Sequence, residues 1–412
     1  MKRNAVAVLV AVLVAGITGC STSGGDSTEP VELSVWAGFT GGPQTAFEAL
    51  VDNYNASQDD VHVTLEITPW GSIAKTLPAA WSTGQGPDLA TPSPDPNVLA
   101  NYLEVNALLP IDNIGDGEGQ INVDDLLPQP IEQYTVDGEL YAVPANAAAL
   151  QLYYNKDLLA AGGFDAPPAT VEELQTMAAA LTGDGVNGLA VADHGSIQVW
   201  AVLQWMAGGD VVDDDFCAAV ATDESVEALE SWAQLAIDGV FPVGLDGAGA
   251  DALFSAGQAA FQLNGPWAAP GFENAGIDFG IAPVPTGVDG QVTLATGAPL
   301  AISAKTEHPK EAQEFLAYWT GEKAQRQFAL DSGFPPVRTD LVDDPEIAEN
   351  PVVQQFAEAL TDARLFLPGV PSASEVITKA WTPLIQEITR GADVRESAET
   401  AAARIDDLTG CQ

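Results

Sequence analysis

The residues best suited to hold a ligand are aromatic, and one of them stands in an unusual backbone context. Trp267 lies in the stretch NGPWAAP, between Pro266 and Pro270 and just after the segment AAFQLN. Proline fixes φ and cannot donate a hydrogen bond to a sheet, so this indole lies on stiff backbone beyond an expected strand. A rigid aromatic plane can stack on the C–H face of a sugar ring at low entropic cost. The alternative is that Trp267 packs in the core, as tryptophan often does.

The sequence offers no motif for metal, nucleophilic or phosphate chemistry. His62, His194 and His308 are far apart, and the patterns HExxH, CxxC, GxSxG and GxxxxGK[ST] do not occur. We therefore expect neither a catalytic metal nor a cofactor, and we interpret the run DDD at 213–215 as an acidic loop rather than a calcium site. Paired carboxylates for glycoside cleavage stay open, because 58 acidic residues always offer pairs.

Alternating strands and helices are expected to position these side chains. VELSVWA and VHVTLEI have the pattern of strands, QTAFEALVDNYNA has helical spacing, and SIAKTLPAAWSTG predicts a helix interrupted at Pro78. Such alternation predicts βαβ units and a mainly parallel sheet covered on both faces. Ligands bind beyond the carboxyl ends of the strands in sheets of this type. This places Trp36, Gly41, Gly42 and the loop around Asp95 on a candidate binding rim.

Two local signals define turns and caps. YTVDGELYAVP predicts a hairpin that turns at Asp137 and Gly138. PPATVEELQTMAAALTG predicts a helix that begins after Thr170, with Glu173 completing a capping box.

Length and charge bound the class of protein. A chain of 412 residues is too long for one ordinary core, so two domains are expected. The formal net charge of −44 repels nucleic acid and anionic lipid headgroups, which excludes both as main partners.

The amino terminus has the layout of an export signal. Lys2 and Arg3 precede the apolar run AVAVLVAVLVAGI, which is too short to span a bilayer and ends in ITGC. This ending resembles the bacterial lipoprotein signal, in which Cys20 would become the lipid-bearing first residue; the alternative is an ordinary secretory peptide with a chance cysteine. Residues 1–20 are thus read as signal peptide and 21–30 as a flexible tether. We expect the mature protein on the outer face of the cytoplasmic membrane, held there by its lipid only.

Two further cysteines remain after Cys20. Cys217 and Cys411 either pair, as thiols outside the cell commonly do, or stay as two separate buried thiols.

Seven short blocks occur in an order that is familiar. They are GPDLA, DGELYAVP, LYYNKDLL, PPATVEEL, GQAAFQLNGPWA, FGIAPVP and HPKEAQEFLAYWTG. Together, across about 31–412, they resemble the extracellular solute-binding proteins of sugar-type ABC importers, the group that contains maltose and trehalose binders.

The resemblance implies an α/β, two-lobed periplasmic-binding-protein-like fold with hinge crossings and a ligand cleft between the lobes. Lobe one would hold 31–145 and 303–338, and lobe two 146–300 and 341–412. The chain would cross near Ala145–Asn146, near Leu300–Ser303 and after GFPPVR. The implied function is that of a monomeric binding protein, without enzymatic activity, that captures a di- or oligosaccharide and delivers it to the permease subunits of an ABC importer.

The resemblance also implies a set of ligand-binding residues. In sugar binders of this family the tryptophan of NGPWA stacks on a sugar ring, and Trp267 occupies that place. The other candidates, each weighed against core packing or a turn role, are Trp36, Trp70, Asp95, Asn146, Gln198, Trp200, Phe334 and Arg338.

Departures from the family pattern bear on the ligand. The maltose branch has a glutamate in the stretch that here reads ANAAALQ, and Glu375 and Lys379 stand in PSASEVITKAW where those proteins often have an aromatic residue. A maltose assignment is therefore weaker than a carbohydrate assignment.

The basic residues bear on the charge of the ligand. Loss of Lys2 and Arg3 with the signal leaves 12 of the 14 basic residues, scattered along the chain, which favours a neutral ligand over an anion. Three alternatives remain: a binder of a betaine- or polyamine-like cation, held by some of the nine tryptophans, a secreted glycoside-processing enzyme, and a lipid-tethered adhesin or scaffold.

Overall fold

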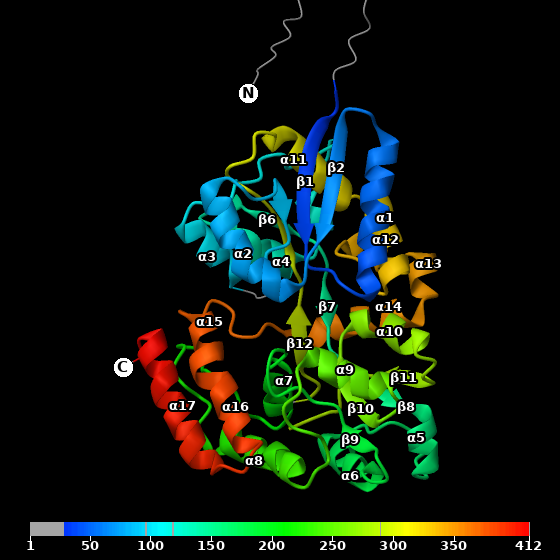
Figure 1. Cartoon of the computed structure of the whole chain (residues 1–412), viewed down its shortest axis with the longest axis vertical. Coiled ribbons are helices and arrows are strands. Elements are labelled where there is room, and N and C mark those ends of the chain that lie inside the picture. Colours follow the sequence, from blue (N-terminus) through cyan, green and yellow to red (C-terminus); the bar gives the residue numbers. More distant parts are fainter. Residues whose placement is uncertain (1–28, 95–96, 118, 289, 412) are drawn as a thin grey trace, which may run out of the picture.

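A mixed five-stranded sheet forms the centre of the first lobe, at the top of Figure 1. The computed structural model describes residues 29–94, 97–117, 119–288 and 290–411. The strand order is β2 (Val61–Ile67), β1 (Val31–Ala37), β3 (Leu89–Ala90), β13 (Pro299–Ile302) and β6 (Ala142–Pro144). β1 pairs in parallel with β2 and β3, whereas β13 is antiparallel to both of its neighbours. Alternate residues of β1 and β2 are buried, so one face of this edge covers the core.

Helices cover both faces of this sheet. They are α1 (Gly42–Ser57), α2 (Trp70–Thr83), α3 (Val98–Glu104), α4 (Pro128–Tyr134), α11 (Pro309–Trp319) and α12 (Glu322–Ser332), with the short helix η1 (Val123–Asp125) and the hairpin β4 (Thr135–Val136) and β5 (Glu139–Leu140).

A four-stranded sheet forms the centre of the second lobe. Its order is β11 (Phe279–Ala282), β8 (Gln151–Asn155), β10 (Ala259–Asn264) and β9 (Asn187–Leu189). β10 is parallel to β9 and antiparallel to β8. The helices of this lobe are α5 (Lys156–Ala161), α6 (Val171–Leu181), α7 (Val199–Met206), α8 (Asp223–Ile237), α9 (Gly247–Ser255), η2 (Pro266–Ala268), α10 (Ala269–Asn274), α14 (Pro351–Ala359), η4 (Leu360–Asp362), α15 (Ala373–Val376), the π-helical η5 (Ile377–Trp381), α16 (Thr382–Ile388) and α17 (Val394–Thr409).

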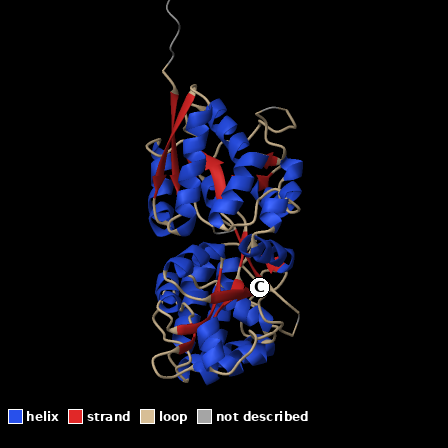
Figure 2. Ribbon diagram, turned by 90° about the vertical axis from the view of Figure 1, so that its right-hand side faces the viewer, coloured by secondary structure: helices blue, strands red, loops and turns tan. Residues whose placement is uncertain are grey.

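Extended segments join the two lobes, which lie one above the other in the view turned by 90° (Figure 2). β7 (Ala148–Ala149) pairs antiparallel with β12 (Thr293–Thr296), which pairs in parallel with β14 (Ala363–Arg364). The backbone amide of Ala145 donates to the carbonyl of Ala298 over 2.8 Å. The first two crossings are therefore hydrogen-bonded to each other.

The expectation of mainly parallel sheets holds only in part, because one strand of each sheet runs opposite to the others, and the crossings explain why. β1, β2, β3 and β6 run toward the second lobe, whereas β13 brings the chain back and must run the opposite way. In the second lobe, β8 carries the chain away from the first lobe. It is antiparallel to β10 and β11, which run toward the first lobe. The antiparallel strand of each sheet, β13 or β8, is thus the one that follows a crossing between the lobes.

The lobe boundaries differ from those predicted by a few residues. Ala298 and Leu300 are buried in the core of lobe one, so the second crossing lies before β13 rather than at Leu300–Ser303. After GFPPVR, where the third crossing was predicted, the chain stays beside lobe one through η3 (Thr339–Leu341) and α13 (Pro345–Ala348), because Leu341 and Ile347 pack on Ala329 of α12.

Local expectations mostly agree with the structure. Asp137 and Gly138 both have positive φ, of 53° and 84°, as a tight hairpin turn requires. The Thr170 side chain and Glu173 form the predicted capping box at the start of α6. The predicted break at Pro78 is wrong, since α2 continues through it. Pro78 is exposed, so water can satisfy the carbonyl that its ring leaves without a donor.

Candidate functional site

The carboxyl ends of the parallel strands in the two lobes face each other across the middle of the molecule (Figure 1). On the first lobe, β1 ends at Ala37 and β3 at Ala90. On the second, β10 ends at Asn264 and is followed directly by the 3-10 turn η2, which carries Trp267. This is the edge at which open α/β sheets bind ligands.

Trp267 occupies the junction of the two lobes. Its half-buried side chain packs against the core of lobe one, against the main core of lobe two and against the smaller cluster around Tyr153. Its ring centroid lies 6.2 Å from that of Phe334, which belongs to lobe one. No other partly buried hydrophobic side chain in the described ranges packs against all three clusters, so the position of Trp267 depends on how the lobes meet.

The facing surface of lobe one is built around a glycine. The ring of Trp70 lies so close over Gly38 that a Cβ there would overlap it, and the Gly38 amide donates to Oγ1 of Thr91 over 3.0 Å. Thr91 in turn donates its backbone amide to the carbonyl of Trp36. The loop after β1 and the end of β3 are thereby tied together beside the half-buried rings of Trp36 and Trp70.

A chain of aromatic contacts continues from this surface to lobe two. Phe39 lies 5.3 Å from Trp70 and 6.4 Å from Phe334, centroid to centroid, and Phe334 contacts Trp267. Close by, a Cβ on Gly42 would lie 2.9 Å from Cγ of Pro270. Small residues at this point let the start of α1 approach the second lobe.

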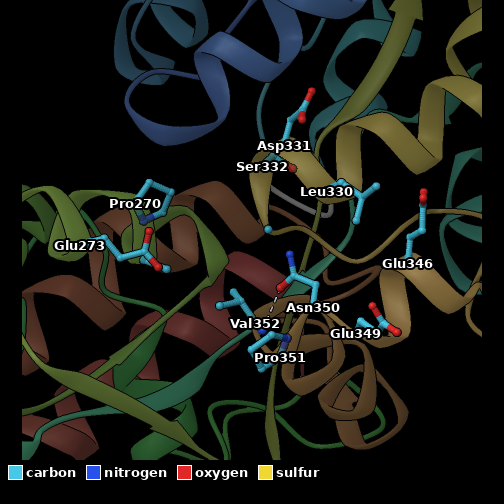
Figure 3. Close-up of a pocket in the computed structure, with 12 residues that line it drawn as sticks. Pro270, Glu273, Leu330, Asp331, Ser332, Glu346, Glu349, Asn350, Pro351 and Val352 are labelled. Atoms are coloured by element: carbon cyan, nitrogen blue, oxygen red, sulfur yellow. Dashed lines mark hydrogen bonds between the residues drawn. The ribbon is translucent and has the colours of Figure 1, made fainter.

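A cavity of about 530 Å³ lies beside these contacts, between α10 of lobe two and the end of α12 of lobe one (Figure 3). Its lining residues are Ala269, Pro270, Glu273, Leu330, Asp331, Ser332, Gly333, Glu346, Glu349, Asn350, Pro351 and Val352. Four carboxylates and no basic side chain stand among them, and Trp267 lies next to this cavity rather than on its wall.

Two predicted ligand residues have structural roles in this arrangement. Trp200 is fully buried in the core of lobe two, where its indole N–H donates to the carbonyl of Ala192 over 2.9 Å. Arg338 is nearly buried, and its guanidinium donates to both carboxylate oxygens of Asp340 and to Asp125. A further bond to the Thr320 carbonyl leaves Arg338 fully engaged within lobe one. Neither side chain is available to a ligand here.

The remaining predictions fall into different places. Phe334 is buried but forms part of the aromatic chain, and Gln198 is half-buried at the residue before α7. Asn146 is buried in the first crossing, where its Oδ1 accepts from the amide of Ala298 in the second crossing over 2.9 Å, so it joins the two connections. Asp95 and Cys20 lie outside the described residues.

Asn97, which the sequence did not indicate, connects the lobes directly. Its side-chain amide donates to the carbonyl of Leu367 over 2.8 Å and accepts from the amide of Gly369 over 3.0 Å. Asn97 precedes α3 of lobe one, whereas the loop at 367–369 lies in lobe two. The two bonding partners are more than 260 residues away in the chain, so no local pattern predicts the contact.

Burial perturbs two titratable groups behind Trp267. Burial raises the pKa of the Asp251 carboxyl above its usual value, although hydrogen bonds from Gln262 and Asn264 oppose the shift. Burial also raises the pKa of the Tyr153 hydroxyl well above its usual range. Both groups belong to the hydrogen-bonded support of the strand β10.

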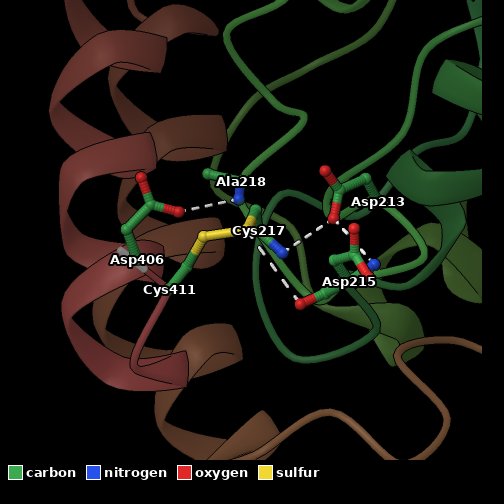
Figure 4. Close-up of a disulfide and its surroundings, with 6 residues drawn as sticks. All are labelled: Asp213, Asp215, Cys217, Ala218, Asp406 and Cys411. Atoms are coloured by element: carbon green, nitrogen blue, oxygen red, sulfur yellow. Dashed lines mark hydrogen bonds between the residues drawn. A yellow bond between two sulfur atoms is a disulfide. The ribbon is translucent and has the colours of Figure 1, made fainter.

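Cys217 and Cys411 form a disulfide whose Cα atoms are 5.3 Å apart (Figure 4). It joins the end of α17 to the loop after α7. Asp406 of α17 also accepts a hydrogen bond from the amide of Ala218 over 2.8 Å. This connection lies on the outside of lobe two and contributes no side chain to the junction of the lobes.

Neither a metal site nor a membrane span is found in the described part of the chain. No cluster of three or more His, Cys, Asp or Glu side chains there has the arrangement of a metal site. None of its helices combines the length and the apolar character needed to cross a bilayer.

Comparison with known proteins places these features in a wider group. Residues 49–355 match the family described as bacterial extracellular solute-binding protein. The chain is 28% identical over 356 residues to a maltotriose-binding protein of Pyrococcus abyssi, which covers 84% of this chain and 75% of the relative. It is 26% identical to a galactooligosaccharide-binding protein of Bacillus subtilis, over 97% and 96% of the two chains. The GacH receptor of Streptomyces glaucescens, solved without ligand and with acarbose, superposes with a TM-score of 0.82 at 24% identity, covering 93% of this chain and 99% of the receptor.

Proposed function

The chain belongs to the bacterial extracellular solute-binding proteins, and from this premise we propose that it captures a di- or oligosaccharide between its lobes and delivers it to an ABC permease. The position of Trp267, in contact with the cores of both lobes, carries the proposal. A ligand that stacks on this indole would touch both halves of the molecule at once. Its binding energy would therefore favour the closed arrangement of the lobes.

A neutral ligand suits the charges of the molecule. Eight Lys and Arg side chains of the described residues already form ion pairs with Asp or Glu. None of the basic residues lines the cavity beside Trp267. An anionic solute would need several free cations that converge on it. The sugars named for the two relatives, maltotriose and galactooligosaccharide, are uncharged and support this view.

One observation favours a second candidate. The cavity carries the carboxylates of Glu273, Asp331, Glu346 and Glu349, which attract positive charge. A betaine- or polyamine-like cation held against tryptophan by cation–π contact would use both features. If the ligand is such a cation, its affinity should be higher at low salt than at high salt. The affinity for a neutral sugar that stacks on the indole should change little with salt.

Export and anchoring complete the proposal. The lipoprotein-like sequence ending at Cys20 supports attachment to the outer face of the membrane, close to the permease, and we propose that the attached protein is a monomer. Its relatives are binding proteins, which supports a binding role rather than an enzymatic one.

The test is a binding screen on the soluble form that begins after Cys20. We expect maltotriose, galactooligosaccharides or a related sugar to raise the melting temperature, because a ligand that binds only the folded state stabilises it. Calorimetric titration at low and high salt then separates sugar from betaine and spermidine. A protein that binds none of these solutes would overturn the proposal, and hydrolysis of an oligosaccharide during the assay would favour an enzyme.

A further inference from the structure

A buried hydrogen-bonded network lies directly behind Trp267. Asp251 of α9 accepts from the side-chain amides of Gln262 and Asn264, both over 2.7 Å, through the same carboxylate oxygen. Gln262 is 3% exposed, and its Oε1 has no partner within the described ranges. Asp251 therefore supplies the one hydrogen bond that the structure shows for the Gln262 side chain.

Asn264 passes this contact to the backbone that precedes the tryptophan. While its Nδ2 is held by Asp251, its Oδ1 accepts from the amide of Gly265 over 2.9 Å. The hydroxyl of the fully buried Tyr153 donates to the carbonyl of Gly265 over 2.9 Å. Both polar groups of the Gly265 backbone are thus bonded to side chains rather than to the sheet, and its carbonyl also accepts from the amide of Ala268 over 3.2 Å.

Gly265 in turn determines where the indole lies. The six-membered ring of Trp267 folds back over the α-carbon of Gly265, so closely that a Cβ at this position would overlap the ring. Pro266 fixes φ between the two residues. The place of the Trp267 ring therefore follows from the placement of the Gly265 peptide groups.

We propose that Asp251 is a positioning residue, which acts through Asn264 and Gly265 to hold the Trp267 indole in the orientation that stacks on the ligand. The inference rests on the proposed function, because it gives that orientation its purpose. A binding group must be held within a fraction of an ångström by its supporting shell, and this network is such a shell. Asp251 itself touches no ligand in this role.

The experiment uses the full soluble chain labelled with 5-fluorotryptophan. The nine tryptophans give nine fluorine signals, and Trp267→Phe identifies the signal of Trp267. In Asp251→Leu we expect the Trp267 signal to shift and broaden while the others stay, and the dissociation constant for maltotriose, or for the sugar that binds best, to rise on the order of tenfold. Asp251→Asn keeps an acceptor oxygen and should restore both.

Controls separate positioning from general loss of stability. Asp246→Ala removes the cap of α9, where Asp246 accepts from the amide of Gly249, and leaves every hydrogen bond of the network in place. At a similar melting temperature it should leave the Trp267 signal and the affinity unchanged. If Asp251→Leu does not fold, Asn264→Ala breaks the same chain of contacts one step later. An unmoved Trp267 signal in the folded variant overturns the inference, whereas absence of sugar binding by the wild type overturns only the proposed function.

Discussion

At the scale of single residues, Trp267 and Trp200 show how one residue type takes two roles. Trp267 is half-buried where both lobes meet, and Trp200 is enclosed in one lobe with its N–H satisfied. We expect Trp267→Ala to weaken sugar binding by about 1–3 kcal/mol, or about 5- to 150-fold in Kd, through lost stacking and burial. Isothermal titration calorimetry measures this. Trp200→Phe is the control, which should lower the melting temperature and keep the Kd; equal affinity in wild type and Trp267→Ala would remove Trp267 from the site.

Asp251 also gives a prediction for pH. Because burial raises the pKa of its carboxyl above the usual 3.8, the folded chain binds this proton more tightly than the unfolded chain. The resulting stability is fully present below the usual pKa and is lost as pH rises through the raised pKa. Asp251→Asn does not titrate in this range. The melting temperature of the wild type minus that of Asp251→Asn should therefore be larger at about pH 4 than at about pH 7. A difference that stays constant or shrinks on acidification contradicts the assigned shift.

Replacement of Arg338 should lower the stability of the protein and leave its affinity for sugar unchanged, whereas replacement of Trp267 should lower the affinity. Replacement by Gln leaves Asp125 and Asp340 without their shared cation, so we expect a loss of about 2–4 kcal/mol in the free energy of unfolding and an unchanged Kd for sugar. Urea denaturation and calorimetry give the two values. Arg395→Gln, which removes an exposed pair with Asp223, should cost below about 1 kcal/mol. Weaker sugar binding at unchanged stability would return Arg338 to the candidate site.

At the scale of elements, the sequence predicted well those features that depend only on residues close to each other in the chain. The strands β1 and β2, the hairpin turn at Asp137–Gly138 and the capping box of α6 follow from alternation, turn chemistry and capping within a few residues. The family resemblance supplied the two-lobed fold. The direction of β13 and β8 was missed, because it is set by the return of the chain from the other lobe.

The candidate site was less predictable for the same reason. Trp267 was found because its proline context is local, whereas the roles of Arg338 and Asn146 depend on partners 213 and 152 residues away. A buried guanidinium next to a distant aspartate and an exposed one beside a ligand look alike in sequence. The hydrogen bonds of Asn97 between the lobes, which we call the Asn97 clamp, were missed for the same reason, since its partners follow it by 270 and 272 residues.

The carboxyl-terminal helix α17 is an element whose attachment can be tested. Its disulfide closes a loop with a sequence separation of 194 residues, and it should stabilise the folded protein by about 2–5 kcal/mol. We expect a reducing agent to lower the urea midpoint of the soluble wild type, and Cys217→Ser with Cys411→Ser to start at the lower value and not respond. The affinity for sugar should change little, because the disulfide lies away from the junction of the lobes. A urea midpoint of the wild type that is the same with and without reducing agent would show that the thiols are not paired in solution.

At the scale of the whole molecule, the lobes contact each other at Asn97 as well as at Trp267. Asn97 forms two hydrogen bonds to the 367–369 loop of lobe two. On the other side of the junction, the start of α1 at Gly42 lies so close to α10 that a Cβ there would be 2.9 Å from Cγ of Pro270 (Figure 1). We expect such contacts to raise the population of the closed form before sugar binds. Apparent affinity rises with that population, because binding then spends less free energy on closing the lobes.

Asn97→Ala tests this relation between closure and affinity. Asn97 makes no capping bond to α3, so its loss should remove the contact between lobes without unfolding the helix. We expect the sugar-free radius of gyration from X-ray scattering to increase, the sugar-saturated value to match the wild type, and the Kd to rise in proportion to the lost closed fraction. Asn101→Ala, an exposed change on the same helix, is the matched control and should alter none of the three. Were Asn97→Ala to scatter like the wild type without sugar and bind it equally well, the clamp would have no part in closure, and stacking on Trp267 alone would have to bring the lobes together.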